Sequence, residues 1–301
     1  MHYRGRFAPS PTGALHFGSL IAATASYLDA RTHGGEWLLR IEDVDIDRRQ
    51  PGATEEILRT LERFGFIWDG PVIRQALRND TYELALTWLR EQALAYPCAC
   101  SRKEIAAQAA RPAIDGGYVY PGTCRNGLQP NQVARAWRLR THDQDICFVD
   151  RIQGPVSQNL EHDVGDFILR RADGLFAYQL AVVLDDHLQG ITDIVRGADL
   201  LASTPRQIFL QQAFGFPTPR YAHLPVATNS TGEKWSKQTQ APALLRGNEA
   251  ADLVRALAFL GQAVPASLSH GQVKDVWEWA LTHWSLTAIP RILSINAPAV
   301  S

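Results

Sequence analysis

The first 41 residues carry the pattern that most restricts the fold. A strand-like segment from Tyr3 to Ala8 is followed by a turn-rich cluster, residues 9–13, and then by apolar and small residues from Leu20 to Ala30 without a helix breaker. Two glycines at 34–35 end this helix before a second apolar, strand-like run at 37–41. A strand, a helix and another strand in this order predict a βαβ unit, and therefore an α/β fold with a parallel sheet.

The middle of the chain has a different character. Helices are predicted from Thr54 to Phe64 and from Asp80 to Ala95, because apolar residues recur there at helical spacing. Short β-like pieces follow at 136–140 and 146–149, among many turn residues. This change in character indicates a subdomain inserted into the α/β core.

After the insertion, the pattern of the core resumes. Apolar runs at 176–184 and 191–195 predict strands inside a parallel sheet, and the Ser-Thr-Pro sequence at 203–205 predicts the start of a helix. Ala- and Leu-rich stretches between about 241 and 293 predict a small helical region. The expected division is 1–97 for the first half of the core, 98–175 for the insertion, 176–228 for the second half, and 229–301 for a lysine-bearing loop and C-terminal helices.

Composition excludes several classes of protein. The chain has 301 residues, 46% of them hydrophobic, which is enough to bury a sizeable core. No apolar run approaches the roughly 18 residues of a membrane span, and the start lacks the apolar stretch of a signal peptide. We therefore expect a cytoplasmic protein with no membrane partner. The net charge of -1 does not indicate a nucleic-acid partner, so any basic surface must be local.

Two short segments suit phosphate chemistry. A helix that begins directly after a strand offers backbone N–H groups to phosphate oxygens, and His16 is expected in the first turn of such a helix. Only four of the 30 basic residues are lysines, and two of these, Lys234 and Lys237, lie three positions apart. Two cations could stabilise the charge that develops on a departing pyrophosphate. A lone histidine is more often packed or solvated, so the interpretation depends on both segments together.

The two segments resemble the two signature motifs of class I aminoacyl-tRNA synthetases. They read His-Phe-Gly-Ser at 16–19 and Lys-Trp-Ser-Lys-Gln at 234–238. Residues 6–13 (Arg-Phe-Ala-Pro-Ser-Pro-Thr-Gly) and 39–43 (Leu-Arg-Ile-Glu-Asp) resemble the glutamate-specific branch of that class. The resemblance extends through about residue 240. Within the branch, the chain is most similar to paralogues of glutamyl-tRNA synthetase that lack an anticodon-binding domain, and its short C-terminal region fits that absence.

The resemblance implies a Rossmann-like parallel sheet, a zinc-bearing inserted subdomain and a short C-terminal helical region. It also implies a monomer that uses ATP with Mg²⁺ to convert L-glutamate to glutamyl adenylate, and then transfers glutamate to queuosine in the anticodon loop of tRNA(Asp). The implied catalytic residues are His16, Lys234 and Lys237, and the implied ATP contacts are His16, Gly18, Ser19 and Lys237. The implied glutamate site consists of Arg6, Phe7, Ala8, Pro9, Ser10, Glu42, Tyr178 and Arg196. Within it, the arginines would pair with the carboxylates, while Glu42 and Tyr178 would hold the ammonium group.

Two residues depart from the family pattern. Ser19 stands where the first motif usually has a second histidine, and Trp235 stands where the second motif usually has methionine. Ser19 still offers a hydroxyl donor, and Trp235 keeps the apolar character of its position. Catalysis is still expected, with altered contacts to ATP.

Three of the four cysteines are spaced like metal ligands. Cys98 and Cys100 form a Cys-x-Cys pair, and Cys124 follows a Pro-Gly-Thr turn, which together suit tetrahedral zinc with one further ligand. The family resemblance implies Tyr120 as the fourth ligand, with Tyr118 and His142 as alternatives. Reduced cysteines without metal are the simpler possibility. The remaining cysteine, Cys147, lies between two apolar residues and is expected to be small and buried.

Two other functions remain open from the sequence alone. A glutamyl-tRNA synthetase fragment that charges the tRNA 3′ end would share every catalytic residue, so only the acceptor would distinguish it. A non-catalytic RNA-binding relative would have lost its ATP chemistry, which the retained histidine, lysines and arginines argue against.

Overall fold

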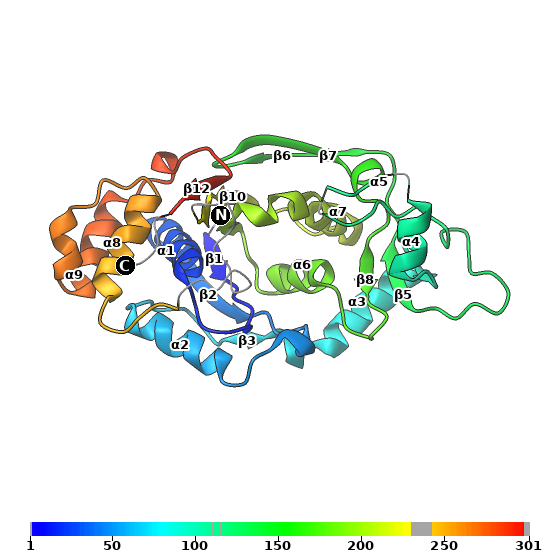
Figure 1. The fold of residues 1–301 in the computed structure, drawn as a ribbon, viewed down its shortest axis with the longest axis horizontal. Helices are drawn as coiled ribbons and strands as arrows, with labels where there is room; N and C mark the ends of the chain where they lie inside the picture. The colour runs from blue at the N-terminus through cyan, green and yellow to red at the C-terminus, as the bar shows by residue number, and fades with distance from the viewer. Residues whose placement is uncertain (1, 110, 115, 230–242, 298–301) are drawn as a thin grey trace.

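A computed structural model describes residues 2–109, 111–114, 116–229 and 243–297. The molecule is elongated (Figure 1): the sheet strands occupy the middle, the C-terminal helices lie at one end and the inserted segment lies at the other. Within these ranges, no helix is both long enough and apolar enough to cross a membrane.

The predicted βαβ unit at the N-terminus is confirmed. Strand β1 (Arg4–Phe7) leads through helix α1 (Phe17–Thr32) to strand β2 (Glu36–Ile41), and the two strands pair in parallel. A Cβ atom at Gly35 would collide with the carbonyl of Tyr3, so this close approach requires glycine. Strand β3 (Ile73–Arg74) pairs in parallel with β2. The first half of the core also contains the 3₁₀ turns η1 (Ile46–Arg48) and η2 (Gln75–Leu77) and the predicted helices α2 (Ala53–Arg63) and α3 (Asn79–Glu91).

The sequence prediction is wrong for one element in the second half of the core. The run at 176–184 is not a strand, because helix α6 (Tyr178–Leu188) occupies it. All residues of this helix from Leu180 to Asp186 are buried, so its apolar residues form an unbroken run without helical periodicity. The remaining elements are β9 (Asp193–Gly197), η3 (Ala198–Ser203), the predicted helix α7 (Thr204–Phe214) and β10 (Arg220–Leu224), which is parallel to β9.

The parallel strands of the first half, β1 to β3, lie beside those of the second half, β9 and β10, with β1 next to β9. The Thr192 N–H donates to the Arg4 carbonyl at 2.9 Å, just before β9 begins. As a result, the carboxyl ends of β1, β2 and β9 lie at one edge, where ligands bind in α/β sheets.

The inserted segment folds mainly as two antiparallel groups of strands. One group is β4 (Ala95–Cys98), β5 (Ala136–Leu139) and β8 (Ile168–Arg170), and the other is the hairpin of β6 (Asp145–Asp150) and β7 (Gly154–Asn159). Short helices α4 (Arg102–Gln108) and α5 (Leu160–Asp163) flank them. The β6–β7 hairpin runs along one side of the molecule, from the core toward the insertion (Figure 1).

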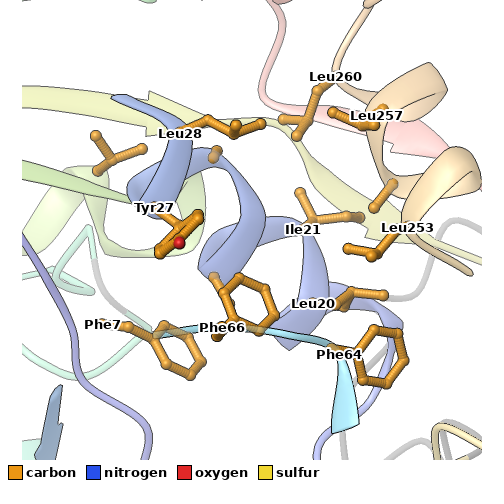
Figure 2. Close-up of a cluster of buried hydrophobic side chains, with 14 of the residues drawn as sticks. Phe7, Leu20, Ile21, Tyr27, Leu28, Phe64, Phe66, Leu253, Leu257 and Leu260 are labelled. Atoms are coloured by element: carbon orange, nitrogen blue, oxygen red, sulfur yellow. The ribbon is translucent and has the colours of Figure 1, made fainter. Parts of the chain in front are cut away.

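The C-terminal region packs on the first helix of the core. Figure 2 shows Leu20 and Ile21 of α1 facing Leu253, Leu257 and Leu260, which belong to or directly follow helix α8. The region consists of α8 (Glu249–Phe259), η4 (Ala266–His270), α9 (Val273–His283), η5 (Leu286–Ala288) and β12 (Ser294–Asn296), which pairs in parallel with β11 (Val226–Thr228).

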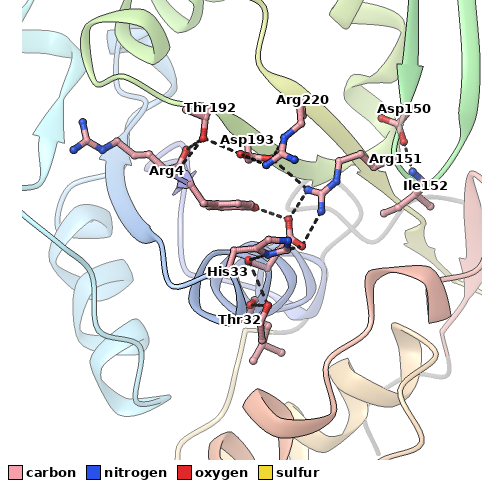
Figure 3. A network of polar contacts seen from close by, with 12 residues as sticks. Arg4, Thr32, His33, Asp150, Arg151, Ile152, Thr192, Asp193 and Arg220 are labelled. Carbon is pink, nitrogen blue, oxygen red and sulfur yellow. Dashed lines mark hydrogen bonds and ion pairs between the residues drawn. The ribbon is translucent and has the colours of Figure 1, made fainter. Parts of the chain in front are cut away.

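A polar network ties the β6–β7 hairpin to the core (Figure 3). Arg151, in the turn after β6, contacts Asp29 of α1 at 2.6 Å and Asp193 of β9 at 3.5 Å. Both carboxylates are buried, and Arg220 supplies a second cation at 2.8 Å from Asp193. The hairpin is therefore anchored by charges that are paired inside the core.

Candidate active site

The N-terminus of helix α1 has the geometry expected of a phosphate site. His16 is the N-cap residue, and its Nδ1 accepts a hydrogen bond from the Ser19 N–H at 3.3 Å. Gly18 and Ser19 form the first turn of the helix, directly after the turn that follows β1. The prediction that His16 lies at the start of this helix is confirmed. In this arrangement Nδ1 is the acceptor, so the ring proton of neutral His16 belongs on Nε2.

A buried ionic network lies at the ends of the first two strands. Arg6 of β1 pairs with Asp186 at 3.2 Å, and Arg40 of β2 pairs with the same carboxylate at 2.7 Å. Arg40 also contacts Glu42 at 3.1 Å. All four side chains are at most 8% exposed, so these charges interact in a medium that screens them weakly.

The two carboxylates of this network differ in their protonation behaviour. Burial acts to raise the pKa of Asp186, but Arg40 and Arg6 more than offset it, and the pKa lies below its ordinary value. For Glu42, burial dominates and raises the pKa, although the same two arginines oppose the shift. Asp186 therefore has its positive partners in the protein, whereas Glu42 would gain from a further cation.

Tyr178 and Arg196 join this network from the second half of the core. Tyr178 begins helix α6, and burial together with the charge of Glu42 raises its pKa to about 12, against the opposing effects of Arg196 and Arg6. The structure thus brings Arg6, Glu42, Tyr178 and Arg196 into electrostatic contact, although they are far apart in the sequence.

Two of the three guanidinium nitrogens of Arg196 are hydrogen-bonded within the core. Its Nε donates to His223 at 3.1 Å, and its Nη2 donates to Thr204 at 2.8 Å and to Gln207 at 2.7 Å. Its Nη1 is buried and has no hydrogen-bond partner among the described residues. A buried N–H without an acceptor is costly, so this atom marks the place where an anionic ligand would bind.

The other predicted glutamate residues lie between β1 and the first helix. Phe7 ends β1, and Ala8, Pro9 and Ser10 follow it. The Pro9 carbonyl accepts a hydrogen bond from the Glu42 N–H at 3.0 Å, which ties this segment to the end of β2.

The lysine segment, with Lys234, Trp235 and Lys237, lies outside the described residues. The chain is described again from Ala243, which forms a β-bridge with His16. Leu244 then donates its N–H to the Leu15 carbonyl at 3.2 Å. The residues that follow the lysine segment in the sequence therefore reach the N-terminus of α1.

The predicted cysteine cluster is brought together in the insertion. The sulfur atoms of Cys98, Cys100 and Cys124 lie within 4.8 Å of one another. The Tyr120 hydroxyl oxygen lies 3.4 Å from the Cys98 sulfur and 3.6 Å from the Cys100 sulfur. Tetrahedral zinc with Zn–S bonds of about 2.3 Å requires sulfur atoms roughly 3.8 Å apart, which this cluster nearly provides. The donor set therefore fits zinc.

Two thiols of the cluster differ in acidity: burial raises the pKa of Cys100 to about 11, whereas the pKa of Cys124 lies below its ordinary value. Burial acts to raise the pKa of its thiol, but hydrogen bonds, first from the Ala99 N–H and then from Tyr120, lower it below the ordinary value. Zinc binds the thiolate form.

Tyr118, one alternative fourth ligand, is 54% exposed, and the ring of the other, His142, packs against Phe209 at 5.0 Å. Of the three candidates, Tyr120 contacts the cysteines.

The expectation for Cys147 is wrong. This cysteine is exposed on β6, where its sulfur lies 3.3 Å from the Ser157 hydroxyl. Side chains alternate along a strand, so Ile146 takes the buried position and Cys147 faces outward.

Sequence reasoning did not identify three buried polar residues that lie close to this network: Asp186, His223 and Asp150. Asp186 lies in helix α6, two residues beyond the run that was predicted as a strand, so no inward direction was assigned to it. His223 lies one residue before the carboxyl end of the buried strand β10, which is a usable signal, because carboxyl ends of strands form ligand sites. The approach of Asp150 from the insertion has no local sequence signal.

Comparisons with known proteins agree with this geometry. Residues 2–254 match the model of the tRNA synthetases class I (E and Q), catalytic domain. The chain is 64% identical over 297 residues to a protein of Dechloromonas aromatica named glutamyl-Q tRNA(Asp) synthetase, covering 99% of both chains. It is 56% identical over 296 residues to the protein of the same name from Aromatoleum aromaticum, covering 98% of this chain and 93% of that protein.

A solved structure shares the fold. The crystal structure of glutamate-tRNA synthetase from Elizabethkingia anophelis matches with a TM-score of 0.80 at 27% sequence identity, covering 100% of this chain and 68% of that one. Such likeness over the whole described fold confirms the class I parallel α/β architecture expected from the sequence. The chain belongs to the class I tRNA synthetases of the glutamate and glutamine type and, within them, to the group of the glutamyl-Q tRNA(Asp) synthetases.

Proposed function

We propose that this enzyme activates L-glutamate with ATP and Mg²⁺ and transfers it to queuosine in the anticodon loop of tRNA(Asp), in the cytoplasm. The observation that carries the proposal is the buried Nη1 of Arg196, which has no hydrogen-bond partner among the described residues. Arg196 also acts on Tyr178 together with the charges of Glu42 and Arg6. The relatives at 64% and 56% identity, both named glutamyl-Q tRNA(Asp) synthetase, support the acceptor.

In the first step, the α-carboxylate of glutamate attacks the α-phosphorus of ATP. A new P–O bond gives glutamyl adenylate, and the bond to the β-phosphate breaks to release pyrophosphate. Arg6 and Arg196 bind the glutamate carboxylates, while Glu42 and the neutral phenol of Tyr178 hold its ammonium group. His16, Gly18 and Ser19 contact the nucleotide at the start of α1, and Lys234 and Lys237 stabilise the charge on the phosphates, together with Mg²⁺.

In the second step, a hydroxyl of the queuosine cyclopentenediol attacks the carbonyl carbon of the adenylate. An ester bond to the tRNA forms, AMP leaves and the hydroxyl proton is released. Exposed bases of an anticodon loop can stack on aromatic rings and arginine planes, which is how proteins commonly bind single-stranded RNA.

We also propose a structural zinc ion in the inserted subdomain, residues 98–175. Cys98, Cys100, Cys124 and Tyr120 would hold it, and it would supply folding free energy to a segment with a small apolar core.

Activation is tested by glutamate-dependent exchange between ATP and pyrophosphate. Lys237→Ala should lower the exchange rate by roughly two orders of magnitude, because a cation on the leaving phosphates is lost. Lys274→Ala is the matched control, since that lysine is exposed on α9 and pairs with the likewise exposed Glu278. Exchange at the wild-type rate in Lys237→Ala would contradict the assignment of that lysine.

The amino-acid pocket is tested in the same assay. Arg196→Ala should raise the KM for glutamate about 100-fold, because a substrate carboxylate loses its charged partner in a buried site. An unchanged KM would remove Arg196 from the pocket.

The acceptor is tested with radiolabelled glutamate and purified tRNAs. Label should transfer to tRNA(Asp) that contains queuosine, and should be absent from unmodified tRNA(Asp) and from tRNA(Glu). It should stay with the anticodon fragment after nuclease cleavage, and prior periodate oxidation of the diol should abolish transfer. Label on the 3′ adenosine of tRNA(Glu) would instead favour a glutamyl-tRNA synthetase activity.

A further inference from the structure

Arg196 is held in one orientation by neutral hydrogen-bond acceptors. Thr204 and Gln207 of helix α7 accept from its Nη2, and His223 of β10 accepts from its Nε. The guanidinium group also lies 5.4 Å from the ring of Tyr221. These contacts fix the plane of the guanidinium group. The direction of Nη1 therefore depends on Thr204, Gln207 and His223.

His223 can accept from Arg196 only in one tautomer. Its Nδ1 lies 2.6 Å from the Asp150 carboxylate, and its Nε2 lies 3.1 Å from Arg196 Nε. Arg196 Nε always carries hydrogen, so Nε2 must present its lone pair, and the single ring proton must lie on Nδ1. The ring is neutral at working pH because burial lowers the pKa of His223 to about 4.

Asp150 enforces that tautomer. One of its oxygens accepts from the backbone N–H groups of Ile152, Gln153 and His223, at 2.9, 2.9 and 3.1 Å, and the other faces His223 Nδ1. Its side chain is fully buried. Because every group around it is a donor, Asp150 is an ionised acceptor and requires a proton on Nδ1.

We propose that Asp150 and His223 are positioning residues for glutamate binding: Asp150, at the end of β6, selects the His223 tautomer that orients Arg196. The inserted hairpin thereby takes part in building the amino-acid pocket of the core. This inference rests on the proposed function, because it assumes that Arg196 binds a carboxylate of glutamate.

Asp150→Asn tests the inference by replacing one carboxylate oxygen with an NH₂ group. The amide oxygen can still accept from the backbone N–H groups, but the amide NH₂ would then face Nδ1 and drive the ring proton to Nε2, against Arg196 Nε–H. We expect the KM for glutamate to rise at least about tenfold and the KM for ATP to change less than about twofold. Asp145→Asn is the matched control, because Asp145 is exposed on the same strand.

Two substitutions of His223 separate positioning from packing. In His223→Gln, the side-chain oxygen can take the place of Nε2 and accept from Arg196, whereas in His223→Asn the shorter amide can reach only Asp150. The KM for glutamate should therefore rise more in His223→Asn than in His223→Gln. Adding Asp150→Asn to His223→Gln should cause no further rise, since no tautomer remains to be selected. Melting temperatures show whether each variant is folded.

Nitrogen NMR of the His223 ring tests the tautomer without any activity. The proton should lie on Nδ1 in the wild type and on Nε2 in Asp150→Asn. A wild-type proton on Nε2, an unchanged glutamate KM in folded Asp150→Asn, or an equal rise in both KM values would overturn the inference. A wild type without glutamate-dependent exchange would overturn the proposed function instead, and the NMR result would still decide the tautomer.

Discussion

The proposed glutamate pocket in the core and the cysteine cluster in the insertion bury polar groups in different ways. In the pocket, Asp186 lies between Arg6 and Arg40, so positive and negative side chains compensate one another. In the cluster, the sulfur atoms and the Tyr120 oxygen lie against one another, and the Cys100 and Cys124 sulfurs are 3.5 Å apart. Thiolates at this spacing repel unless a cation lies among them.

This difference separates a site that the protein's own charges can preform from one that, as proposed, would need a metal ion. The pocket can keep its shape before any substrate binds, because the protein supplies nearly every partner. The cluster would reach its full stability only with bound metal, because metal binding contributes directly to folding.

Removal of metal should affect the insertion far more than the core. Elemental analysis of the wild type should find about one zinc per chain, and Cys98→Ser combined with Cys100→Ser should lose it. Hydrogen exchange should then become fast in the insertion, while nucleotide affinity stays within about twofold, because the cluster is remote from α1.

Cys147→Ser is the control for the zinc experiment. This exposed cysteine lies on the β6–β7 hairpin outside the cluster, so its loss should leave the zinc content and the exchange pattern unchanged. If the wild type is fully folded without metal, the cluster does not depend on an ion, and the proposed difference between the two sites is wrong.

Arg40→Met should destabilise the core by about 3 to 5 kcal/mol, because it leaves Glu42 and Asp186 buried with too little positive charge. Denaturant unfolding of the zinc-loaded protein measures this free energy. Lys274→Met is the control, since its pair with Glu278 is exposed and should contribute little. Equal stability of Arg40→Met and wild type would mean that the pocket does not depend on its internal charges.

Acid should weaken the core through His223. Its folded pKa of about 4 lies below the ordinary 6.5, so the unfolded chain binds a proton first as the pH falls. The stabilising contribution is therefore complete above pH 6.5 and is lost as the pH falls toward 4, on the order of 3 kcal/mol in all. The difference in unfolding free energy between wild type and His223→Gln, followed from pH 7 to 4.5, should shrink. A constant difference would show that His223 does not resist protonation.

The two sites also differ in how far the sequence predicts them. The cysteine cluster is predictable because its ligands are close together in the chain and zinc demands a known spacing. In the pocket, Arg6, Glu42 and Arg196 were identified through motifs and through their positions at strand ends. Asp186 was missed because its helix is buried on every side, which removes the periodicity that distinguishes helix from strand.

The contacts between distant segments were beyond prediction for a physical reason. Asp150 meets His223 across 73 positions of sequence, and this depends on how the hairpin folds back over the core. Local propensity carries no information about such a meeting. The first βαβ unit, by contrast, was predicted correctly because its strands, helix and breakers are contiguous.

The pairing of β11 with β12 has a consequence for synthesis of the chain on the ribosome. Thr228 and Ile295 are hydrogen-bonded although they are 67 positions apart. At about 5 to 20 residues per second, a ribosome needs roughly 3 to 13 seconds to make the intervening chain. During that time the nascent protein presents β11 with an open edge, which other unfinished chains on the same messenger could pair with. Slow translation between these two strands should therefore favour aggregation, until β12 is made and pairs with β11.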